Sequence, residues 1–293
     1  MSTEPWTTRR LLEWTADYFK GRGIENPRLE TELLLARALG TNRVGLYLRY
    51  EDVPADPERT AFRELVKRRA AGEPSAYLVG HKDFYSLDFD VNADVLIPRP
   101  ETETLVLEGV EFLRGRAKEN PGFAPRVLDI GTGSGVLAVA LARNLPAARL
   151  VAVDISAPAL AMAKKNAEKL GAADRIEFRE SDLFAAVGPD ERFDLIVSNP
   201  PYVSRAEYDA LDKSVKDYEP RIALLSGEEG TEIVARILAE APAHLEPAGR
   251  LLVEISPMIA EASLELLKGS PFRRFNILND YAGQKRVILA EME

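Results

Sequence analysis

The chain has 293 residues, of which 46% are hydrophobic and 29% charged, and its net charge is −9. This composition is that of a globular protein with room for one large domain or two ordinary ones. The lack of cysteine excludes disulfides, thiolate metal sites and cysteine nucleophiles, and two histidines are too few for a histidine-rich metal site.

The charge and the hydropathy of the chain also limit its cellular location and the class of partner that it can bind. The acidic charge argues against broad electrostatic capture of nucleic acid. No stretch approaches the roughly 20 apolar residues that a helix needs to cross a bilayer. Residues 1–6 lack the basic-then-apolar layout of a secretory signal. We therefore expect a cytoplasmic protein that makes no membrane contact.

Residues 1–80 are expected to be helical. Apolar residues recur there at helical spacing, in segments separated by glycine and proline. Gly21-Arg22-Gly23 ends the first segment, and Pro27 opens the second. Because no pattern in this region indicates catalysis, we interpret it as a small domain that packs against or recognises a partner.

Residues 81–104 are expected to form a β-hairpin and a linker. Their mixture of aromatic and β-branched residues predicts two short strands, with Asn92-Ala93-Asp94 as the turn. Pro98-Arg99-Pro100-Glu101-Thr102-Glu103 then forms a stiff connection into a helix, with two acids near the helix N-terminus. Two interpretations of this connection remain open: a surface connector, or a pocket wall to which Arg99 or the acids contribute.

From about residue 105 strands and helices alternate, which predicts a parallel sheet covered by helices. Arg126–Ile130 is the first strand, Gly131-Thr132-Gly133-Ser134-Gly135 is the turn after it, and residues 136–145 are a helix. Glycines at alternate positions allow a sharp turn and let the backbone pass close beneath a ligand. The next strand, residues 150–153, leads to Asp154, and an acid at this place binds ribose hydroxyls in units of this kind.

A third strand, over residues 176–179, is followed by Ser181-Asp182-Leu183-Phe184. Asp182 lies at the end of this strand, where its carboxylate can accept a hydrogen bond from an exocyclic adenine amine. On the sequence alone, a cap for the following turn is an equally good interpretation of Asp182.

The glycine turn does not have the pattern of a dinucleotide site. Such a site has its third glycine three residues after the second, and Val136 occupies that position here. In addition, Asp129 at the strand end beside the turn would repel a pyrophosphate but attract the ammonium group of an amino acid. An adenosyl ligand with a cationic tail fits better, and S-adenosylmethionine is such a ligand.

The apolar run Phe193–Ser198 is expected to be a buried strand that ends at Asn199-Pro200-Pro201-Tyr202. Both prolines fix the backbone and lack an N–H group, so the chain must leave the sheet in one stiff conformation. The Asn199 carboxamide and the Pro200 carbonyl could then hold a substrate –NH2 group for alkylation, with the Tyr202 ring beside it. The alternative is a plain loop with an asparagine turn, and the glycine turn upstream favours the clamp.

The last third of the chain continues the alternation. Residues 216–224 are expected to form a loop over the pocket, followed by a helix over 233–245, a strand over 251–255 and a helix over 260–268. Residues 275–278 and 286–290 are expected to close the sheet as an antiparallel pair.

These motifs resemble a known family. Asp129-Ile130-Gly131-Thr132-Gly133-Ser134-Gly135 is similar to the first motif of class I S-adenosylmethionine-dependent methyltransferases, and Asn199-Pro200-Pro201-Tyr202 is similar to the motif of methyltransferases that modify amino groups. Three further stretches narrow the resemblance to one family of amino-group methyltransferases. They are Val95-Leu96-Ile97-Pro98-Arg99-Pro100-Glu101-Thr102-Glu103, Tyr218-Glu219-Pro220, and Ala282-Gly283 before Arg286-Val287. Together they resemble the peptide chain release factor N5-glutamine methyltransferase family (PrmC/HemK), from about residue 75 onward and more loosely before it.

The resemblance implies an α/β fold. A Rossmann-like class I methyltransferase domain over residues 105–293 would be joined by a β-hairpin and linker, residues 81–104, to a small all-helical substrate-recognition domain over residues 1–80. It also implies methyl transfer from S-adenosyl-L-methionine to the side-chain amide nitrogen (N5) of the glutamine in the Gly-Gly-Gln motif of class I translation release factors.

The resemblance also assigns roles to residues, and it implies no metal. Asn199, Pro200 and Tyr202 would be catalytic, and Pro201 would join them in binding the substrate. The implied cofactor-binding residues are Asp129, Gly131, Thr132, Gly133, Ser134, Gly135, Asp154, Asp182, Leu183 and Asn199.

The chain departs from the family pattern at two places. Ser256-Pro257-Met258 follows Glu254-Ile255, where the family commonly has a glycine and, a few residues on, a glutamine. Leu183 stands where an aromatic residue often lies near the adenine. Neither place belongs to the predicted clamp, so we expect effects on cofactor affinity and loop geometry more than on activity.

Two other functions fit part of the pattern. An adenine-N6 methyltransferase acting on DNA or RNA would use the same Asn199 clamp on a flipped base, but it would need a basic groove with stacking aromatic residues, and the sequence has only short basic runs. A module that only binds an adenosyl ligand has no use for a nitrogen clamp. We therefore expect a protein substrate and no direct nucleic-acid binding. Separately from this argument, we expect a monomer.

Overall fold

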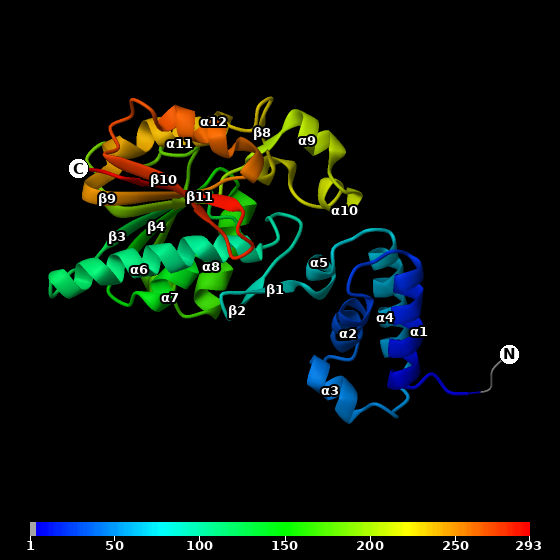
Figure 1. Ribbon diagram of the computed structural model, residues 1–293. Helices are drawn as coiled ribbons and strands as arrows, with labels where there is room; N and C mark the ends of the chain where they lie inside the picture. Colours follow the sequence, from blue (N-terminus) through cyan, green and yellow to red (C-terminus); the bar gives the residue numbers. More distant parts are fainter. Residues whose placement is uncertain (1–3) are drawn as a thin grey trace. The chain divides into compact units, whose positions relative to one another are not determined.

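The computed structural model describes residues 4–293 (Figure 1). It divides into two compact units. The first unit ends at His81 and also contains Lys213–Tyr218, and the second consists of Lys82–Asp212 and Glu219–Glu293. Residues 213–218 thus group with the helical unit, whereas the sequence pattern places them in the methyltransferase domain. Residues 1–3 lie outside the described residues. They belong to the expected domain over residues 1–80 and to the stretch in which the sequence predicts no secretory signal.

The first unit is helical, as the sequence predicts. Its interior is built from leucine and phenylalanine side chains of different helices, and Leu12, Phe19, Leu34 and Leu46 are fully buried. The helices of this unit are α1 (Thr8–Gly21), α2 (Pro27–Ala38), α3 (Arg43–Leu48), α4 (Asp56–Ala70), α5 (Ser75–Val79) and α10 (Lys213–Lys216).

The predicted hairpin is present as β1 (His81–Phe84) and β2 (Leu87–Asp90), but its two strands are not joined by the predicted turn. The two strands are joined at Tyr85-Ser86, whose φ angles are 50° and 58°. Asn92-Ala93-Asp94 does form a turn, in which the Val95 N–H donates to the Asn92 carbonyl at 3.2 Å, but this turn follows the hairpin. Two successive positive φ angles match the twist of a two-residue hairpin. Tyrosine and serine rarely adopt such angles, whereas asparagine and aspartate do so more readily, so the residue types pointed to the wrong turn.

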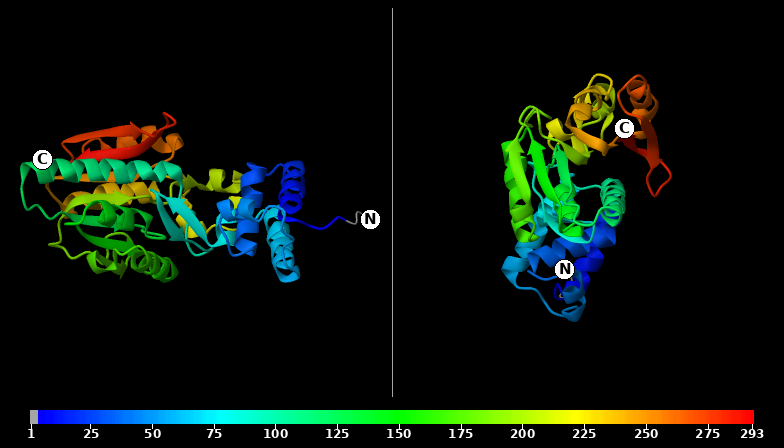
Figure 2. Two further views of the ribbon diagram at one scale, coloured as in Figure 1. Left: turned by 90° about the horizontal axis from the view of Figure 1, so that it is seen from below. Right: turned by 90° about the vertical axis from the view of Figure 1, so that its left-hand side faces the viewer.

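The second unit is built on a sheet that has seven strands within residues 82–293 (Figures 1 and 2). In spatial order the strands are β10 (Arg274–Asn279), β11 (Lys285–Glu291), β9 (Leu245–Glu254), β6 (Phe193–Ser198), β3 (Arg126–Ile130), β4 (Arg149–Asp154) and β5 (Ile176–Glu180). The five strands from β9 to β5 are parallel, whereas β10 and β11 close one end as the predicted antiparallel pair.

Helices cover both faces of this sheet (Figure 1). Successive residues of a strand point to opposite faces, so Leu195 and Val197 of β6 belong to one apolar core and Ile196 to the other. Because both faces are covered, the inner strands are apolar along their length, which makes them visible in the sequence. One layer consists of α6 (Glu103–Glu119), α7 (Val136–Asn144) and α8 (Ala157–Lys169), and the other of α11 (Glu232–Glu240) and α12 (Ala260–Leu267).

Short elements connect these layers, and one of them occupies the end of a predicted helix. The helix expected over residues 233–245 ends at Glu240 and continues as a 3-10 turn that contains Pro242. The short elements are η1 (Pro100–Thr102), η2 (Ala173–Arg175), β7 (Val203–Ser204), α9 (Arg205–Ala210), η3 (Arg221–Ala223), β8 (Leu225–Gly227), η4 (Ala241–His244) and η5 (Pro257–Ile259).

The strand order reverses at β3. The strands β4 and β5 lie on one side of it, and β6 and β9 lie on the other. Ligands of open parallel sheets bind in the crevice that such a reversal leaves at the carboxyl ends of the strands. The loops after β3, β4, β5 and β6 therefore border the expected ligand site.

Within residues 4–293, no helix combines the length and the apolar character needed to span a bilayer.

Candidate active site

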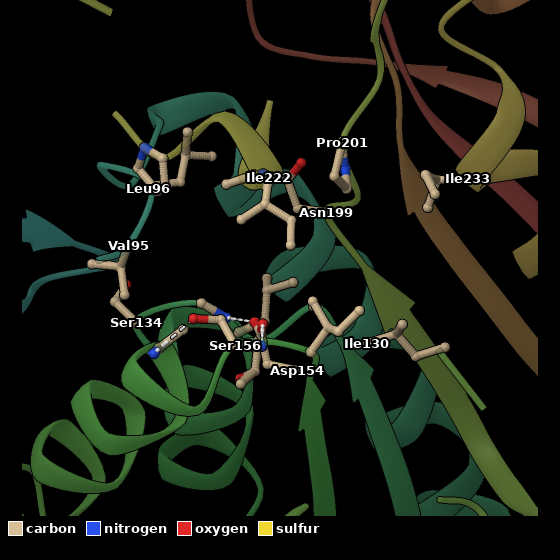
Figure 3. A pocket seen from close by; sticks show the side chains of 18 of the residues that line it. Val95, Leu96, Ile130, Ser134, Asp154, Ser156, Asn199, Pro201, Ile222 and Ile233 are labelled. Carbon is tan, nitrogen blue, oxygen red and sulfur yellow. Dashed lines mark hydrogen bonds between the residues drawn. The ribbon is translucent and has the colours of Figure 1, made fainter. Parts of the chain in front are cut away.

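A cavity of about 290 Å³ lies at the carboxyl ends of β3, β4, β5 and β6, and its lining residues all belong to the second unit (Figure 3). Asp154 and Ser156 lie on one side of it, and Asn199 and Pro201 on the opposite side (Figure 3). The predicted site residues that line the cavity are Gly131, Thr132, Gly133, Ser134, Asp154, Asp182, Leu183, Asn199 and Pro201. The predicted site residues that do not line it are Asp129, Gly135, Pro200 and Tyr202.

The glycine turn forms one wall of the cavity. Gly131, Gly133 and Gly135 have φ angles of 70°, 55° and 83°, which glycine adopts without steric cost. A Cβ on Gly135 would lie 3.1 Å from Cβ of Ala163, so this glycine lets α8 pack closely against the turn. A Cβ on Gly133 would meet no described atom within 4 Å. The turn therefore bends sharply and leaves open space beside the backbone.

Asp154 connects the end of β4 to this turn. Its Oδ2 accepts a hydrogen bond from the Gly133 N–H (2.8 Å), and its Oδ1 accepts one from the Ser156 N–H (2.9 Å). Burial raises the pKa of the Asp154 carboxyl above its ordinary value, and the backbone N–H donors oppose this rise. Each carboxylate oxygen has two lone pairs, so Asp154 keeps acceptor capacity for a hydroxyl group in the cavity.

Asp129 was expected to face a ligand, but its side chain does not line the cavity. Its side chain is fully buried, and its Oδ2 accepts hydrogen bonds from Thr132 Oγ1 (2.7 Å) and the Ala138 N–H (3.1 Å). Burial raises the pKa of Asp129 to about 7. In this position Asp129 ties the glycine turn to α7, and its contact with an ammonium group stays a prediction.

The end of β5 contributes Asp182 and Leu183. The Asp182 carboxylate forms an ion pair with Arg236 of α11 at 3.0 Å, and both side chains are exposed to the cavity and solvent. The side chain that caps the following turn is that of Ser181, which accepts a hydrogen bond from the Ala186 N–H (2.9 Å). The Asp182 carboxylate is thus directed to a charged partner at the cavity, and its contact with an adenine amine stays a prediction.

Asn199 follows β6 directly, at the predicted double-proline corner. The Ser198 hydroxyl donates to the Ile130 carbonyl at 2.8 Å, which holds the end of β6 beside the end of β3. The Asn199 Nδ2 donates to Thr102 Oγ1 at 3.0 Å. Because its nitrogen is engaged in this way, the Asn199 carboxamide has its oxygen available as an acceptor.

Tyr202 lies further along this corner and packs against the core of the sheet. Its hydroxyl donates to Glu254 Oε1 at 3.3 Å. Burial and the nearby Glu254 raise the pKa of Tyr202, and burial raises the pKa of Glu254 to about 7. A Cβ on Gly230 would lie 2.7 Å from the Tyr202 carbonyl oxygen, so only glycine allows this close packing. The packing of the Tyr202 ring on a substrate stays a prediction.

Two segments distant in sequence, residues 95–99 and 220–225, supply further lining residues. Glu219 joins them, because its Oε2 accepts from the Ile97 N–H (3.1 Å) and its Oε1 accepts from Arg99 Nη2 (2.5 Å). Arg99 itself lines the cavity. Of the two interpretations left open for the connection after residue 97, the structure therefore supports the pocket wall.

Two regions of the chain match family descriptions: "PrmC N-terminal domain" over residues 10–80 and "Methyltransferase small domain" over residues 108–217. The release factor glutamine methyltransferase of Rhodopirellula baltica is 49% identical to this chain over 285 residues, which are 97% of this chain and 96% of that protein. That of Geobacter sulfurreducens is 46% identical over 286 residues, again 97% and 96%. The chain belongs to the release factor glutamine methyltransferase family. Both the predicted family and the predicted enzyme class, an S-adenosylmethionine-dependent methyltransferase, are confirmed.

Solved structures confirm the fold of this family member. The hMettl16 catalytic domain in complex with MAT2A 3'UTR hairpin 6 matches with a TM-score of 0.55 at 19% identity, over 81% of this chain and 82% of that one. The T. thermophilus 16S rRNA N2 G1207 methyltransferase (RsmC), in complex with AdoMet and guanosine, matches with a TM-score of 0.50 at 22% identity, over 73% and 50%. The likeness establishes the Rossmann-like class I methyltransferase fold.

The residues of the cavity fit the cofactor of this enzyme class. The open space beside Gly133 gives room for a ligand along the turn, and Asp154 offers carboxylate acceptors at the end of β4. Apolar side chains such as Leu183 and Ile222 supply surface for a flat ring. A cavity of about 290 Å³ lies near the lower end of the range for small-molecule sites.

Three polar residues at the site were not assigned from the sequence. Thr102 and Glu219 lie in stretches that carry the family resemblance, and this resemblance was the one sequence signal that could have marked them as site residues. Glu254 lies two residues before Ser256, where the chain departs from the family pattern, and has no local signal of its own. The structure brings Glu254 to within hydrogen-bond distance of Tyr202, although the two are 52 residues apart.

Proposed function

We propose that this protein transfers a methyl group from S-adenosylmethionine to the side-chain amide nitrogen of the glutamine in the Gly-Gly-Gln motif of class I translation release factors. The observation that carries the proposal is that the corner at Asn199 and Pro201 shares one cavity with the glycine turn and Asp154. Family membership supports the choice of substrate.

The cofactor would be held by the loops after β3, β4 and β5. The Asp154 carboxylate would accept from the ribose hydroxyls, and the Gly133 backbone would allow close approach. The Asp182 carboxylate would accept a hydrogen bond from the adenine amine, and it would then exchange its ion pair with Arg236 or share its oxygens between the two groups. The Leu183 side chain would pack on the adenine ring. When bound, this cofactor supplies an electrophilic methyl group.

The chain's own task is to present the substrate nitrogen. An amide nitrogen is a poor nucleophile because its lone pair is delocalised into the carbonyl group. Hydrogen bonds from the substrate –NH2 to Asn199 Oδ1 and to the Pro200 carbonyl would favour a more pyramidal nitrogen with its lone pair aimed away from both acceptors. Positioning and preorganised acceptors then contribute most of the rate, and the amide proton can leave after the new bond forms.

The helical unit would recognise the release factor, which is a protein, so we propose that the enzyme does not bind nucleic acid directly. The net charge of −9 and the match of residues 10–80 to the family's N-terminal domain support this. We further propose that the enzyme is a monomer and works in the cytoplasm, where newly made release factors occur.

Transfer of tritium from labelled cofactor tests the proposal. A class I release factor, the same factor with its Gly-Gly-Gln glutamine changed to alanine, and bulk RNA are incubated in parallel with the enzyme. We expect label only on the unaltered release factor. Label on the alanine variant would contradict the choice of target atom, and label on RNA alone would indicate a nucleic-acid methyltransferase.

A further inference from the structure

Asn166 on α8 contacts the glycine turn but does not line the cavity. Its side chain is fully buried, where each polar atom needs a partner. Asn166 Nδ2 donates to the Ser134 carbonyl (2.8 Å) and to the Asp90 carbonyl (3.0 Å), and Asn166 Oδ1 accepts from the Asp90 N–H (2.8 Å). One side chain thus joins the glycine turn to the end of β2.

These partners leave one orientation for the Asn166 carboxamide. A backbone N–H group only donates, and a carbonyl oxygen only accepts. The carboxamide oxygen must therefore face the Asp90 N–H, and the –NH2 group must face the two carbonyl oxygens. Because none of these groups titrates, the direction of each hydrogen bond is fixed.

Asn166 also connects two walls of the cavity. Ser134 lines the cavity from the glycine turn, and residues 94–96 line it shortly after Asp90. A displacement of either segment relative to α8 would break buried hydrogen bonds and leave carbonyl groups without partners, which costs free energy. The Asn166 side chain therefore ties together two segments that would both border a bound cofactor.

The same face of α8 holds the glycine turn at a second point. Ala163 and Asn166 are three residues apart, so they are neighbours on the helix surface. A Cβ on Gly135 would lie 3.1 Å from Ala163 Cβ, which shows how closely the turn packs on this face. From β4, the Asp154 carboxylate accepts from the Gly133 N–H at 2.8 Å. The turn is thus held by α8 and by the end of β4.

Ion pairs also join α8 to β2, and the two elements lie side by side (Figure 1). Lys165 Nζ lies 2.7 Å from Asp90 Oδ2. Lys169 Nζ lies 2.6 Å from Asp90 Oδ1 and 2.8 Å from Asp88 Oδ2. The lysine side chains are 63% and 34% exposed, and exposed pairs contribute little and are screened by salt. Because their partners are on β2, they attach the hairpin to α8 without involving the glycine turn.

We propose that Asn166 is a positioning residue for S-adenosylmethionine. It holds the glycine turn and the chain after β2 in the arrangement that the cofactor requires, so that binding does not have to order either segment. Asn166 acts through the Ser134 carbonyl and the Asp90 backbone and need not touch the cofactor. The inference goes beyond the proposed function, because it concerns the cofactor and is the same whichever substrate receives the methyl group.

Substitution of Asn166 by aspartate separates this link from packing. Aspartate has nearly the same shape and keeps an acceptor for the Asp90 N–H, but a carboxyl group offers at most one donor, and none when ionised, for the two carbonyl oxygens. We expect the Kd for S-adenosylhomocysteine, measured by isothermal titration, to rise by about tenfold or more, the usual cost of losing a residue that orients a binding group.

The kinetics of Asn166→Asp distinguish positioning from a general loss of folded protein. The KM for the cofactor should rise, whereas kcat at saturating cofactor should stay within about threefold of the wild type, because the corner at Asn199 is unchanged. A smaller folded fraction would instead lower kcat and leave KM and Kd as they are.

Lys169→Gln is the matched control. It removes the ion pairs with Asp88 and Asp90 and leaves the hydrogen bonds of Asn166 in place. We expect its Kd for S-adenosylhomocysteine to stay within about twofold of the wild type, as for other exposed ion pairs.

Hydrogen–deuterium exchange of the wild-type protein gives a measurement that does not depend on how a variant folds. The Asp90 amide hydrogen is bonded to Asn166 Oδ1, so it exchanges when this link opens. Because the opening also frees the Ser134 carbonyl, saturating S-adenosylhomocysteine should slow exchange at Asp90 by about tenfold or more. The same slowing is expected in Lys169→Gln and not in Asn166→Asp.

The outcomes separate this inference from the proposed function. An unchanged Kd in Asn166→Asp, or an equal rise in Lys169→Gln, would overturn the inference, and so would exchange at Asp90 that does not respond to S-adenosylhomocysteine. Failure of the wild-type enzyme to label any release factor would overturn the proposed function, but it would leave these binding measurements and the role of Asn166 intact.

Discussion

At the scale of single residues, Asn199 and Asp154 reach one cavity from strands on either side of β3. Asn199 follows β6, and Asp154 ends β4. The strand reversal at β3 therefore brings Asn199, the proposed nitrogen clamp, and Asp154, the proposed ribose acceptor, to opposite walls of the same space (Figure 3). Because the two side chains share no hydrogen bond, their substitution should have separable effects.

Replacement of Asn199 by alanine should abolish methyl transfer and spare cofactor binding. The variant loses the carboxamide acceptor, and the loss of one preorganised hydrogen-bonding group typically costs about 10²–10³ in kcat. Single-turnover methylation and a cofactor titration measure the two properties. Asn276→Ala, at an exposed position of β10, is the control. A collapse of cofactor affinity in Asn199→Ala would show that the residue is misassigned.

Replacement of Asp154 by alanine should have the reverse effect. It removes the proposed ribose acceptor and the two backbone hydrogen bonds to Gly133 and Ser156, so the cofactor Kd should rise by at least about tenfold, the cost of a charge-assisted hydrogen bond. Isothermal titration with the cofactor measures the change. Glu180→Ala, at the exposed end of β5, should leave the Kd unaltered. An unchanged Kd in Asp154→Ala would remove the ribose assignment.

At the scale of elements, Glu219 fastens two loops to each other. It is nearly buried and binds both the backbone of Ile97 and the side chain of Arg99, so the two segments that line the cavity behave as one wall. The sequence expectation of a loop over the pocket holds for residues 220–224, of which Pro220, Ile222 and Ala223 line the cavity.

Removal of the Glu219 carboxylate should loosen this wall. Glu219→Ala leaves the Ile97 N–H and Arg99 without their acceptor, and the free energy of unfolding should fall by about 1–3 kcal/mol. We also expect weaker cofactor binding. Urea denaturation and a cofactor titration measure both effects, with Glu228→Ala as an exposed control, since the Glu228 side chain is 76% exposed. Unchanged values of both quantities would mean that the two segments hold their positions independently.

The sequence predicted most of the strands, the glycine turn and the double-proline corner, but it did not predict the hairpin turn or two of the polar residues at the site. The inner strands are readable because both faces of the sheet are covered, and the glycine turn and double-proline corner are readable because glycine and proline have special backbone geometry. The turn at Tyr85-Ser86 was missed because its residue types do not favour positive φ. Thr102 was missed because only the fold brings it beside Asn199, 97 residues later in the chain, and Glu254 was missed because only the fold brings it beside Tyr202.

At the scale of the whole molecule, two buried carboxyl groups link stability to pH. Burial raises the pKa values of Asp129 and Glu254 to about 7 in the folded chain. In the unfolded chain they titrate at ordinary values near 4. The folded state therefore binds more protons than the unfolded state between about pH 4 and pH 7. Stability from this source is complete below that range and is lost as the pH rises through about 7.

The Tm of the wild type should accordingly fall between pH 5 and pH 8, and Glu254→Gln should reduce the fall. A glutamine cannot ionise, so its burial cost does not grow with pH. A difference of one in pKa corresponds to about 1.4 kcal/mol, and we expect Glu254→Gln to remove an effect on the order of 1–3 kcal/mol. Calorimetry across this range measures it, and an identical pH dependence in the two proteins would contradict the raised pKa of Glu254.

The position of β11 inside the sheet governs how the nascent chain can mature on the ribosome. The strand β9 pairs with β6 on one side and with β11 on the other, and β11 is made after β9, α12 and β10. Until residues 285–291 have emerged, one edge of β9 exposes unpaired N–H and C=O groups that can recruit another extended strand. Synthesis that stalls between β9 and β11 should thus yield aggregating fragments, and chaperones that shield sheet edges should act on this enzyme during that interval.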